Sequence, residues 1–113
     1  MNFLFYQMKQ TIRLLLVDDH PFFSEGLTNA LRADTSYQVV ASVQSGEEVV
    51  AAIRTHEPDM LVLDINLPGK NGLELLPELK QKFPSLKIMI LSMYMPADIR
   101  IQPEKEPIDA YVL

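Results

Sequence analysis

The sequence contains no cysteine, and its only two histidines, His20 and His56, lie far apart in the chain. Without cysteine there is no disulfide framework, no thiolate nucleophile and no cysteine-based zinc site, and two isolated histidines make a poor metal cluster. We therefore interpret His20 as a loop residue and His56 as a solvated helix end, and we assign neither a role. A cysteine-free composition suits the cytoplasm, where we expect the protein to act.

An excess of positive charge and a long hydrophobic segment are also missing. Asp and Glu number 15 against 10 Lys and Arg, giving a formal net charge of −5, whereas binding nucleic-acid phosphates requires a basic surface. Residues 1–11 include several apolar side chains, but a membrane span needs about 20 of them and a secretory signal begins with basic residues. We expect no direct contact with nucleic acid and no membrane segment, and we interpret residues 1–11 as an amino-terminal extension.

What the sequence does contain is a series of short apolar segments that alternate with stretches of helical periodicity. At 113 residues the chain is long enough for one hydrophobic core and too short for two. The alternation predicts an α/β domain with a parallel sheet and helices on both faces. Pro77 should bend the last helix or delay its start. The expected strands are Ile12–Val17, Tyr37–Val43, Met60–Asp64, Leu86–Leu91 and Ile108–Leu113, and the expected helices run from Pro21 to Leu31, from Ser45 to Ile53 and from Leu73 to Phe83.

The central strand ends abruptly at a carboxylate. Met60 to Leu63 is an apolar run typical of a strand buried on both faces, and Asp64 follows it directly. Pro68 and Gly69 then break the strand, and Gly72 allows a tight turn before the next amphipathic run. Asp64 should therefore lie at the carboxyl end of its strand, which is the edge of an open α/β sheet where ligands bind.

Two further acids, Asp18 and Asp19, follow the first strand and would share that edge with Asp64 if the two strands are neighbours. Three crowded carboxylates repel one another unless a cation is present, and Mg²⁺ prefers a few carboxylate oxygens together with waters and phosphate oxygens. A carboxylate beside Mg²⁺ is also a competent nucleophile for a phosphoryl group, giving an aspartyl phosphate. Ser92, after the fourth strand, could donate a hydrogen bond to a phosphoryl oxygen.

Taken one at a time, these residues have ordinary structural explanations. A single aspartate at a strand end, such as Asp18, usually forms a turn or caps a helix, and Ser92 alone would usually cap the next helix. Their combination at one sheet edge favours a site for Mg²⁺ and a phosphoryl group.

The segments that carry these residues resemble the four signatures of the response-regulator receiver domain of two-component signalling. They occur in the family's order and at its approximate spacing, and they are most similar to receivers that precede a helix-turn-helix DNA-binding domain. The resemblance covers residues 12–113 and implies a doubly wound, flavodoxin-like sheet with strand order 2-1-3-4-5. The segments are Leu16–His20, Leu63–Gly72, Leu91–Tyr94 and Ala110–Leu113.

The resemblance also implies a role for each polar residue. One carboxylate would accept a phosphoryl group from a sensor histidine kinase, Mg²⁺ would be bound by two acids directly, by a third through water and by one backbone carbonyl, and a hydroxyl and an aromatic ring would form a switch pair. Such a protein is a phosphorylated signalling protein whose usual output is transcription, not a dedicated enzyme. The residues are the phosphoacceptor Asp64, the metal-site residues Asp18, Asp19, Asp64 and Asn66, and the switch pair Ser92 and Tyr111.

The sequence departs from the family pattern in two places. It stops at Leu113, before the family's lysine and fifth helix, and the three prolines of residues 96–107 limit the fourth helix to a turn or so. An uncovered sheet face and a free edge strand favour a homo-oligomer. Besides a phosphoacceptor, the sequence leaves open a phosphorylation-independent interaction and dimerisation module. A magnesium-dependent phosphohydrolase is disfavoured, because Asn66 stands where such enzymes carry a protonating acid.

Overall fold

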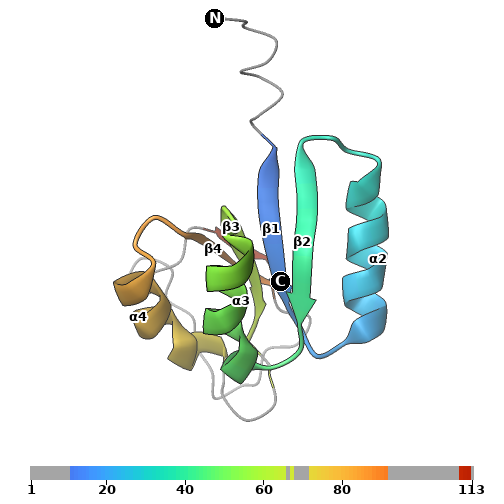
Figure 1. The fold of residues 1–113 in the computed structure, drawn as a ribbon. Coiled ribbons are helices and arrows are strands. Elements are labelled where there is room, and N and C mark those ends of the chain that lie inside the picture. Colours follow the sequence, from blue (N-terminus) through green and yellow to red (C-terminus); the bar gives the residue numbers. More distant parts are fainter. Residues whose placement is uncertain (1–10, 66, 68–71, 92–109, 113) are drawn as a thin grey trace, which may run out of the picture.

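A five-stranded parallel sheet forms the centre of the molecule, with the strand order β2-β1-β3-β4-β5 (Figure 1). The computed structural model describes residues 11–65, 67 and 72–91, and the backbone of residues 110–112. The predicted α/β fold and its strand order are confirmed. The strands are β1 (Ile12–Val17), β2 (Tyr37–Val43), β3 (Met60–Asp64), β4 (Lys87–Leu91) and β5 (Ala110–Val112), and the helices are α2 (Pro21–Arg32), α3 (Val49–His56), preceded by a 3-10 turn at Gly46–Glu48, and α4 (Gly72–Lys82).

Helix α4 differs from its prediction in the effect of Pro77. Helix α4 begins at Gly72, so Pro77 lies inside the helix and does not delay its start. Pro77 is exposed to solvent, and the helix continues to Lys82 although proline has no backbone N–H to donate. The buried face of α4, formed by Leu75, Leu76 and Leu79, explains why the helix persists, since tertiary packing outweighs local propensity.

The main hydrophobic core lies between one face of the sheet and helices α3 and α4. Alternate strand residues point to this face, as the period of two in a β-strand requires. Leu15, Leu61, Leu63, Ile88 and Ile90 are fully buried there. Figure 1 shows α3 and α4 against this side of the sheet, while α2 lies beyond β2. The core residues supplied by the two helices are Val49, Ala52, Ile53, Leu75, Leu76 and Leu79.

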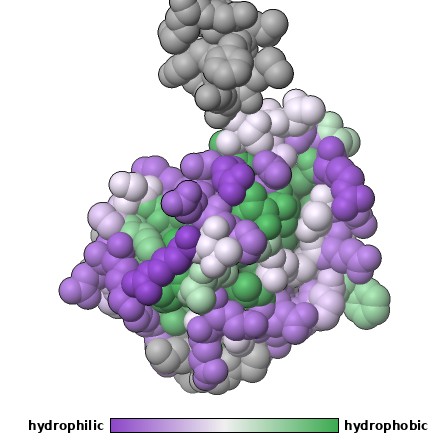
Figure 2. Space-filling model, viewed as in Figure 1, coloured by the Kyte–Doolittle hydropathy of each residue, from purple (hydrophilic) through white to green (hydrophobic). Residues whose placement is uncertain are grey.

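The opposite face of the sheet is covered in part by α2. The strand residues Leu16 and Val62 are buried on this side, and Phe23 and Leu27 of α2 line the same small cavity. Phe22 of α2, by contrast, is 91% exposed. Hydrophilic side chains cover most of the surface in Figure 2, with hydrophobic residues visible in patches between them. No helix within the described ranges is long and apolar enough to span a bilayer.

The register of the central strands determines which residues meet at the edge of the sheet. Val17 of β1 is paired with Leu63 of β3, so the residues that follow them in each strand leave the sheet at the same level. Asp64, the last residue of β3, is paired in turn with Leu91 of β4. The carboxyl ends of β1 and β3 therefore form one edge, as the sequence predicts.

Candidate functional site

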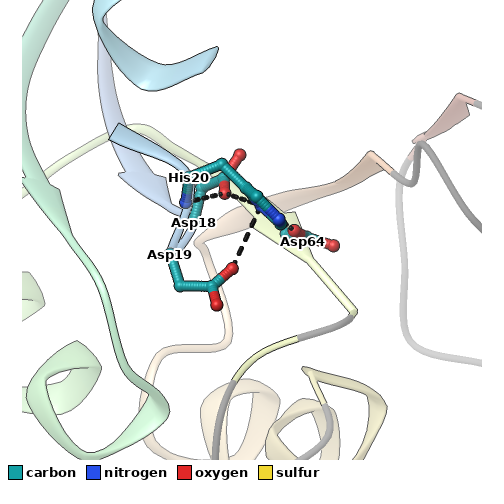
Figure 3. A network of polar contacts seen from close by, with 4 residues as sticks. All are labelled: Asp18, Asp19, His20 and Asp64. Atoms are coloured by element: carbon teal, nitrogen blue, oxygen red, sulfur yellow. Dashed lines mark hydrogen bonds and ion pairs between the residues drawn. The ribbon is translucent and has the colours of Figure 1, made fainter. Parts of the chain in front are cut away.

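The carboxyl ends of β1 and β3 bring three aspartates together. Asp18 and Asp19 follow β1, Asp64 ends β3, and their side chains converge with that of His20 (Figure 3). One potential ligand atom from each of the four residues lies within 4.8 Å of the others. The sequence-based expectation that the three acids share one sheet edge is therefore confirmed, and a histidine joins them.

Both the backbone N–H and the side chain of Asp18 form hydrogen bonds. Its backbone N–H donates to the carbonyl of Val43, 3.0 Å away, which continues the ladder between β1 and β2. Its Oδ1 accepts a hydrogen bond of 2.7 Å from the backbone N–H of His20, the pattern of an Asx turn. This turn leads into α2, whose first residue, Pro21, has the backbone φ angle that a helix start requires. The side chain of Asp18 is 9% exposed.

Asp64 lies in a part of the backbone that is anchored in the hydrophobic core. Its neighbours Leu63 and Ile65 are 0% and 1% exposed, so the chain is anchored in the core on both sides of the carboxylate. Gly72 donates its backbone N–H to the carbonyl of Ile65 at 2.9 Å, which ties the start of α4 to the end of β3. The Asp64 side chain is 11% exposed.

Gly72 permits this close approach because it has no side chain. A Cβ atom at this position would lie 2.7 Å from the carbonyl oxygen of Asp64 and 2.8 Å from the Cα of Ile65. Such distances are well inside van der Waals contact, and both atoms belong to the backbone. Gly72 is thus the first residue of α4 and packs against the backbone of Asp64 and Ile65, whereas the tight turn predicted before it lies outside the described residues.

His20 points its Nδ1 atom at all three carboxylates. Nδ1 lies 2.8 Å from Asp18 Oδ1, 3.0 Å from Asp19 Oδ1 and 3.5 Å from Asp64 Oδ2. The hydrogen bond to Asp18 raises the pKa of His20 above its ordinary value of 6.5, the charges of the three acids add to this effect, and desolvation opposes it. A protonated imidazole at this position balances part of the negative charge of the cluster.

One carboxylate oxygen in the cluster has no hydrogen-bond donor. The Oδ1 atom of Asp19 is buried and accepts no hydrogen bond, although His20 Nδ1 is 3.0 Å away. A ring nitrogen carries at most one hydrogen, and Nδ1 is hydrogen-bonded to Asp18 Oδ1 at 2.8 Å. A buried carboxylate oxygen without a donor is costly, and a cation in the cluster would satisfy it. The donor set of three carboxylates therefore fits a hard divalent ion such as Mg²⁺.

The sequence predicted that the three acids share one sheet edge, but it did not reveal that His20 joins them. His20 is a loop residue between β1 and α2, as predicted, but its ring lies in the acid cluster, which was not foreseen. The Asp-x-His spacing of the Asx turn is the local signal that could have revealed it. Three other predicted site residues are not tested, because Asn66, Ser92 and the side chain of Tyr111 lie outside the described residues.

The fold and the acid cluster together define a class of protein. A parallel sheet of order 2-1-3-4-5 with three aspartates at the carboxyl ends of β1 and β3 is typical of receiver domains in two-component signalling. Residues 14–113 match the family described as the response regulator receiver domain. The chain belongs to this family.

Relatives of the chain include regulators of transcription. It is 35% identical to the transcriptional regulatory protein DegU of Brevibacillus brevis over 83 residues, which are 74% of this chain and 35% of DegU. It is 32% identical to the nitrate/nitrite response regulator protein NarL of Escherichia coli K12 over 100 residues, which are 88% of this chain and 46% of NarL. The chain thus spans less than half the length of these relatives.

A solved receiver domain has the same fold. The structure of the signal receiver domain of the putative response regulator NarL from Mycobacterium tuberculosis superimposes with a TM-score of 0.79. The two chains are 25% identical, and the match covers 91% of this chain and 83% of the other.

Proposed function

We propose that this receiver domain accepts a phosphoryl group from a sensor histidine kinase onto Asp64, in the presence of Mg²⁺, and thereby switches an output. The observation that carries the proposal is the convergence of Asp18, Asp19 and Asp64, with one buried oxygen of Asp19 that has no donor. An isolated strand-end aspartate would be a turn former, but three of them directed at one point create a site for a cation and for phosphoryl chemistry.

The reaction requires little movement of the chain. A carboxylate oxygen of Asp64 attacks the phosphorus of a phosphohistidine, the new O–P bond forms, and the N–P bond breaks with its electron pair passing to the imidazole nitrogen. Because Leu63 and Ile65 anchor the backbone on either side, the Asp64 carboxylate is held in place before the phosphoryl donor arrives. Its low exposure limits the access of water to the acyl phosphate that results.

The metal would be held by Asp19 and Asp64 directly, by Asp18 through water and by the carbonyl of Asn66. When bound, Mg²⁺ supplies positive charge that neutralises the phosphoryl oxygens. Asp18 contributes by fixing the β1–α2 turn, since its carboxylate accepts the backbone N–H of His20. The proposed switch pair of Ser92 and Tyr111 would report the phosphorylated state.

A small phosphoryl donor tests the proposal without the kinase. Incubation with acetyl phosphate and Mg²⁺ should add one phosphoryl group by intact-mass spectrometry, and Asp64→Asn should abolish the adduct. Asp34→Asn, a change at an exposed aspartate outside the cluster, should leave it unchanged. An adduct that persists in Asp64→Asn would refute the assignment, and no adduct in the native chain would favour the phosphorylation-independent interaction module.

The wider setting of the protein is part of the same proposal. DegU, which is named as a transcriptional regulatory protein, supports an output in transcription, reached through a partner or a further segment and not through direct contact of this domain with nucleic acid. We place the receiver at residues 12–113, with residues 1–11 as an extension, and the protein in the cytoplasm as a signalling protein, not a dedicated enzyme. Self-association stays a prediction, which light scattering after size exclusion tests.

A further inference from the structure

The position of His20 in the acid cluster has no part in the phosphoryl transfer described above. Its ring comes from the turn between β1 and α2, and Figure 3 shows it directed into the space between the three carboxylates. The ring makes no side-chain cap for α2, and its side chain is 62% exposed. Its place is therefore determined by the acids and not by packing or by a role in the helix.

The distances around Nδ1 are those expected between neighbouring ligands of one metal ion. Metal–ligand distances of about 2.1 Å in an octahedral site put adjacent ligand atoms about 3.0 Å apart. Nδ1 lies 2.8, 3.0 and 3.5 Å from oxygens of Asp18, Asp19 and Asp64, respectively. Small adjustments of an exposed ring would accommodate an ion that all four residues share.

The buried oxygen of Asp19 is an independent indication of a ligand. It lies beside Nδ1 but accepts no hydrogen bond, so the imidazole alone does not complete the cluster. An ion bonded to both atoms would satisfy the oxygen and, by displacing the proton of Nδ1 to solvent, would take up the electron pair of the nitrogen. The resulting donor set, three carboxylates and one imidazole, differs from the all-oxygen set that magnesium prefers.

We propose that His20 Nδ1 is a ligand of the ion bound by this aspartate cluster, and that it raises the affinity of the site for first-row divalent transition ions, such as Ni²⁺, relative to its affinity for Mg²⁺. The inference rests on the metal site of the proposed function. Imidazole is a better ligand for transition ions than for magnesium, so His20 shifts the preference of the site away from Mg²⁺.

Electron spin-echo envelope modulation of the Mn²⁺-loaded chain detects a bound imidazole directly through its ¹⁴N coupling. The native chain should show this coupling. His20→Ala and His20→Gln should both lose it, the second variant keeping a polar side chain at the turn. His56→Ala is the matched control and should retain the coupling, because the other histidine of the chain lies at the end of α3, outside the acid cluster.

Metal affinity gives a second readout. Ni²⁺ should bind His20→Ala at least about tenfold more weakly than the native chain, given that even residues behind a metal ligand change affinity 10- to 100-fold. Mg²⁺ affinity should change by less than about threefold, since imidazole contributes little to a magnesium site. Circular dichroism of each variant checks that the fold is retained.

The possible failures are distinguishable. Mn²⁺ bound without ¹⁴N coupling in the native chain, or coupling that survives in His20→Ala, would overturn the role of His20 and leave the metal site of the proposed function intact. Tighter binding of every ion by His20→Ala would also overturn it, because the imidazole would then be a competitor of the metal. Failure of the native chain to bind any divalent ion would remove the proposed metal site itself.

Discussion

Two glycines in helices should respond to the same substitution with opposite signs. Gly26 lies in the middle of α2, is exposed, and has nothing within 4 Å of the position that a Cβ atom would take. Gly26→Ala should therefore stabilise the fold by about 0.5–1 kcal/mol, the difference in helix propensity between the two residues. This variant shows what alanine contributes when space is available.

At Gly72 the same methyl group meets the backbone of the site. A Cβ there would lie 2.7 Å from Asp64 O, 2.8 Å from Ile65 Cα and 3.3 Å from Asp64 C. No flexible side chain can yield, so either α4 or the end of β3 must shift. Forcing extra atoms into a packed region costs about 1–3 kcal/mol, which exceeds the propensity gain of up to about 1 kcal/mol. We expect Gly72→Ala to be about 1–2 kcal/mol less stable than the native chain.

Urea unfolding of both variants beside the native chain tests this reasoning. A higher midpoint for Gly26→Ala and a lower one for Gly72→Ala, with unchanged slopes, is the expected result. Amide chemical shifts should change at Asp64 and Ile65 in Gly72→Ala, since these residues carry the contacted atoms. If Gly72→Ala is as stable as the native chain, or if both variants shift in the same direction, the close approach of α4 to Asp64 is not a packing constraint.

Three further changes test other parts of the molecule. Folding raises the pKa of His20 above 6.5, so protonation of its ring stabilises the fold fully below pH 6.5, and this contribution is lost as the pH rises through the folded-state pKa. The difference in unfolding free energy between the native chain and His20→Ala should therefore shrink over that rise. In NMR titrations, Asp18→Asn should lower the His20 pKa more than substitution of either other acid does. Magnesium should bind with an affinity on the order of millimolar, as expected for few direct carboxylates, and NMR shifts that avoid Asp18, Asp19 and Asp64 would contradict the proposed site. Leu76→Ala, at a fully buried position, should cost about 2–5 kcal/mol in urea unfolding, whereas Phe22→Ala, at a 91% exposed one, should change stability by less than about 0.5 kcal/mol.

The architecture could be predicted because the central strands β1 and β3 are buried on both faces along most of their length. A strand covered on both sides must be apolar throughout, so Leu14 to Val17 and Leu61 to Leu63 stand out as continuous hydrophobic runs. Their bounds in the structure agree with the prediction for β1, β2 and β3, and the order of the strands follows from the family resemblance. The convergence of the three acids then follows from two neighbouring strands that end at the same level.

The contacts of Gly72 could not be predicted from the sequence. A glycine after a Pro-Gly pair is an ordinary sign of a turn, and the predicted helix begins only one residue later than α4 does, but nothing in the local pattern reveals the contact with Asp64. The contact depends on how closely a helix approaches the strand end seven residues or more earlier in the chain, which is a property of the packed core. Pro77 illustrates the same limit, because its place inside α4 is decided by the buried leucines around it.

The position of the His20 ring follows from the backbone geometry of its turn and from the negative charge at this edge of the sheet. The Asx turn of Asp18 fixes the backbone of His20, and Pro21 restricts the conformations open to the residue before it. These two constraints keep the ring close to Asp18 but do not determine which way it points. The remaining negative charge comes from Asp19 and from Asp64, which joins the cluster only when β3 pairs with β1. The inward direction of the ring is stabilised by its hydrogen bond to Asp18 and, when the ring is protonated, by the charges of all three carboxylates.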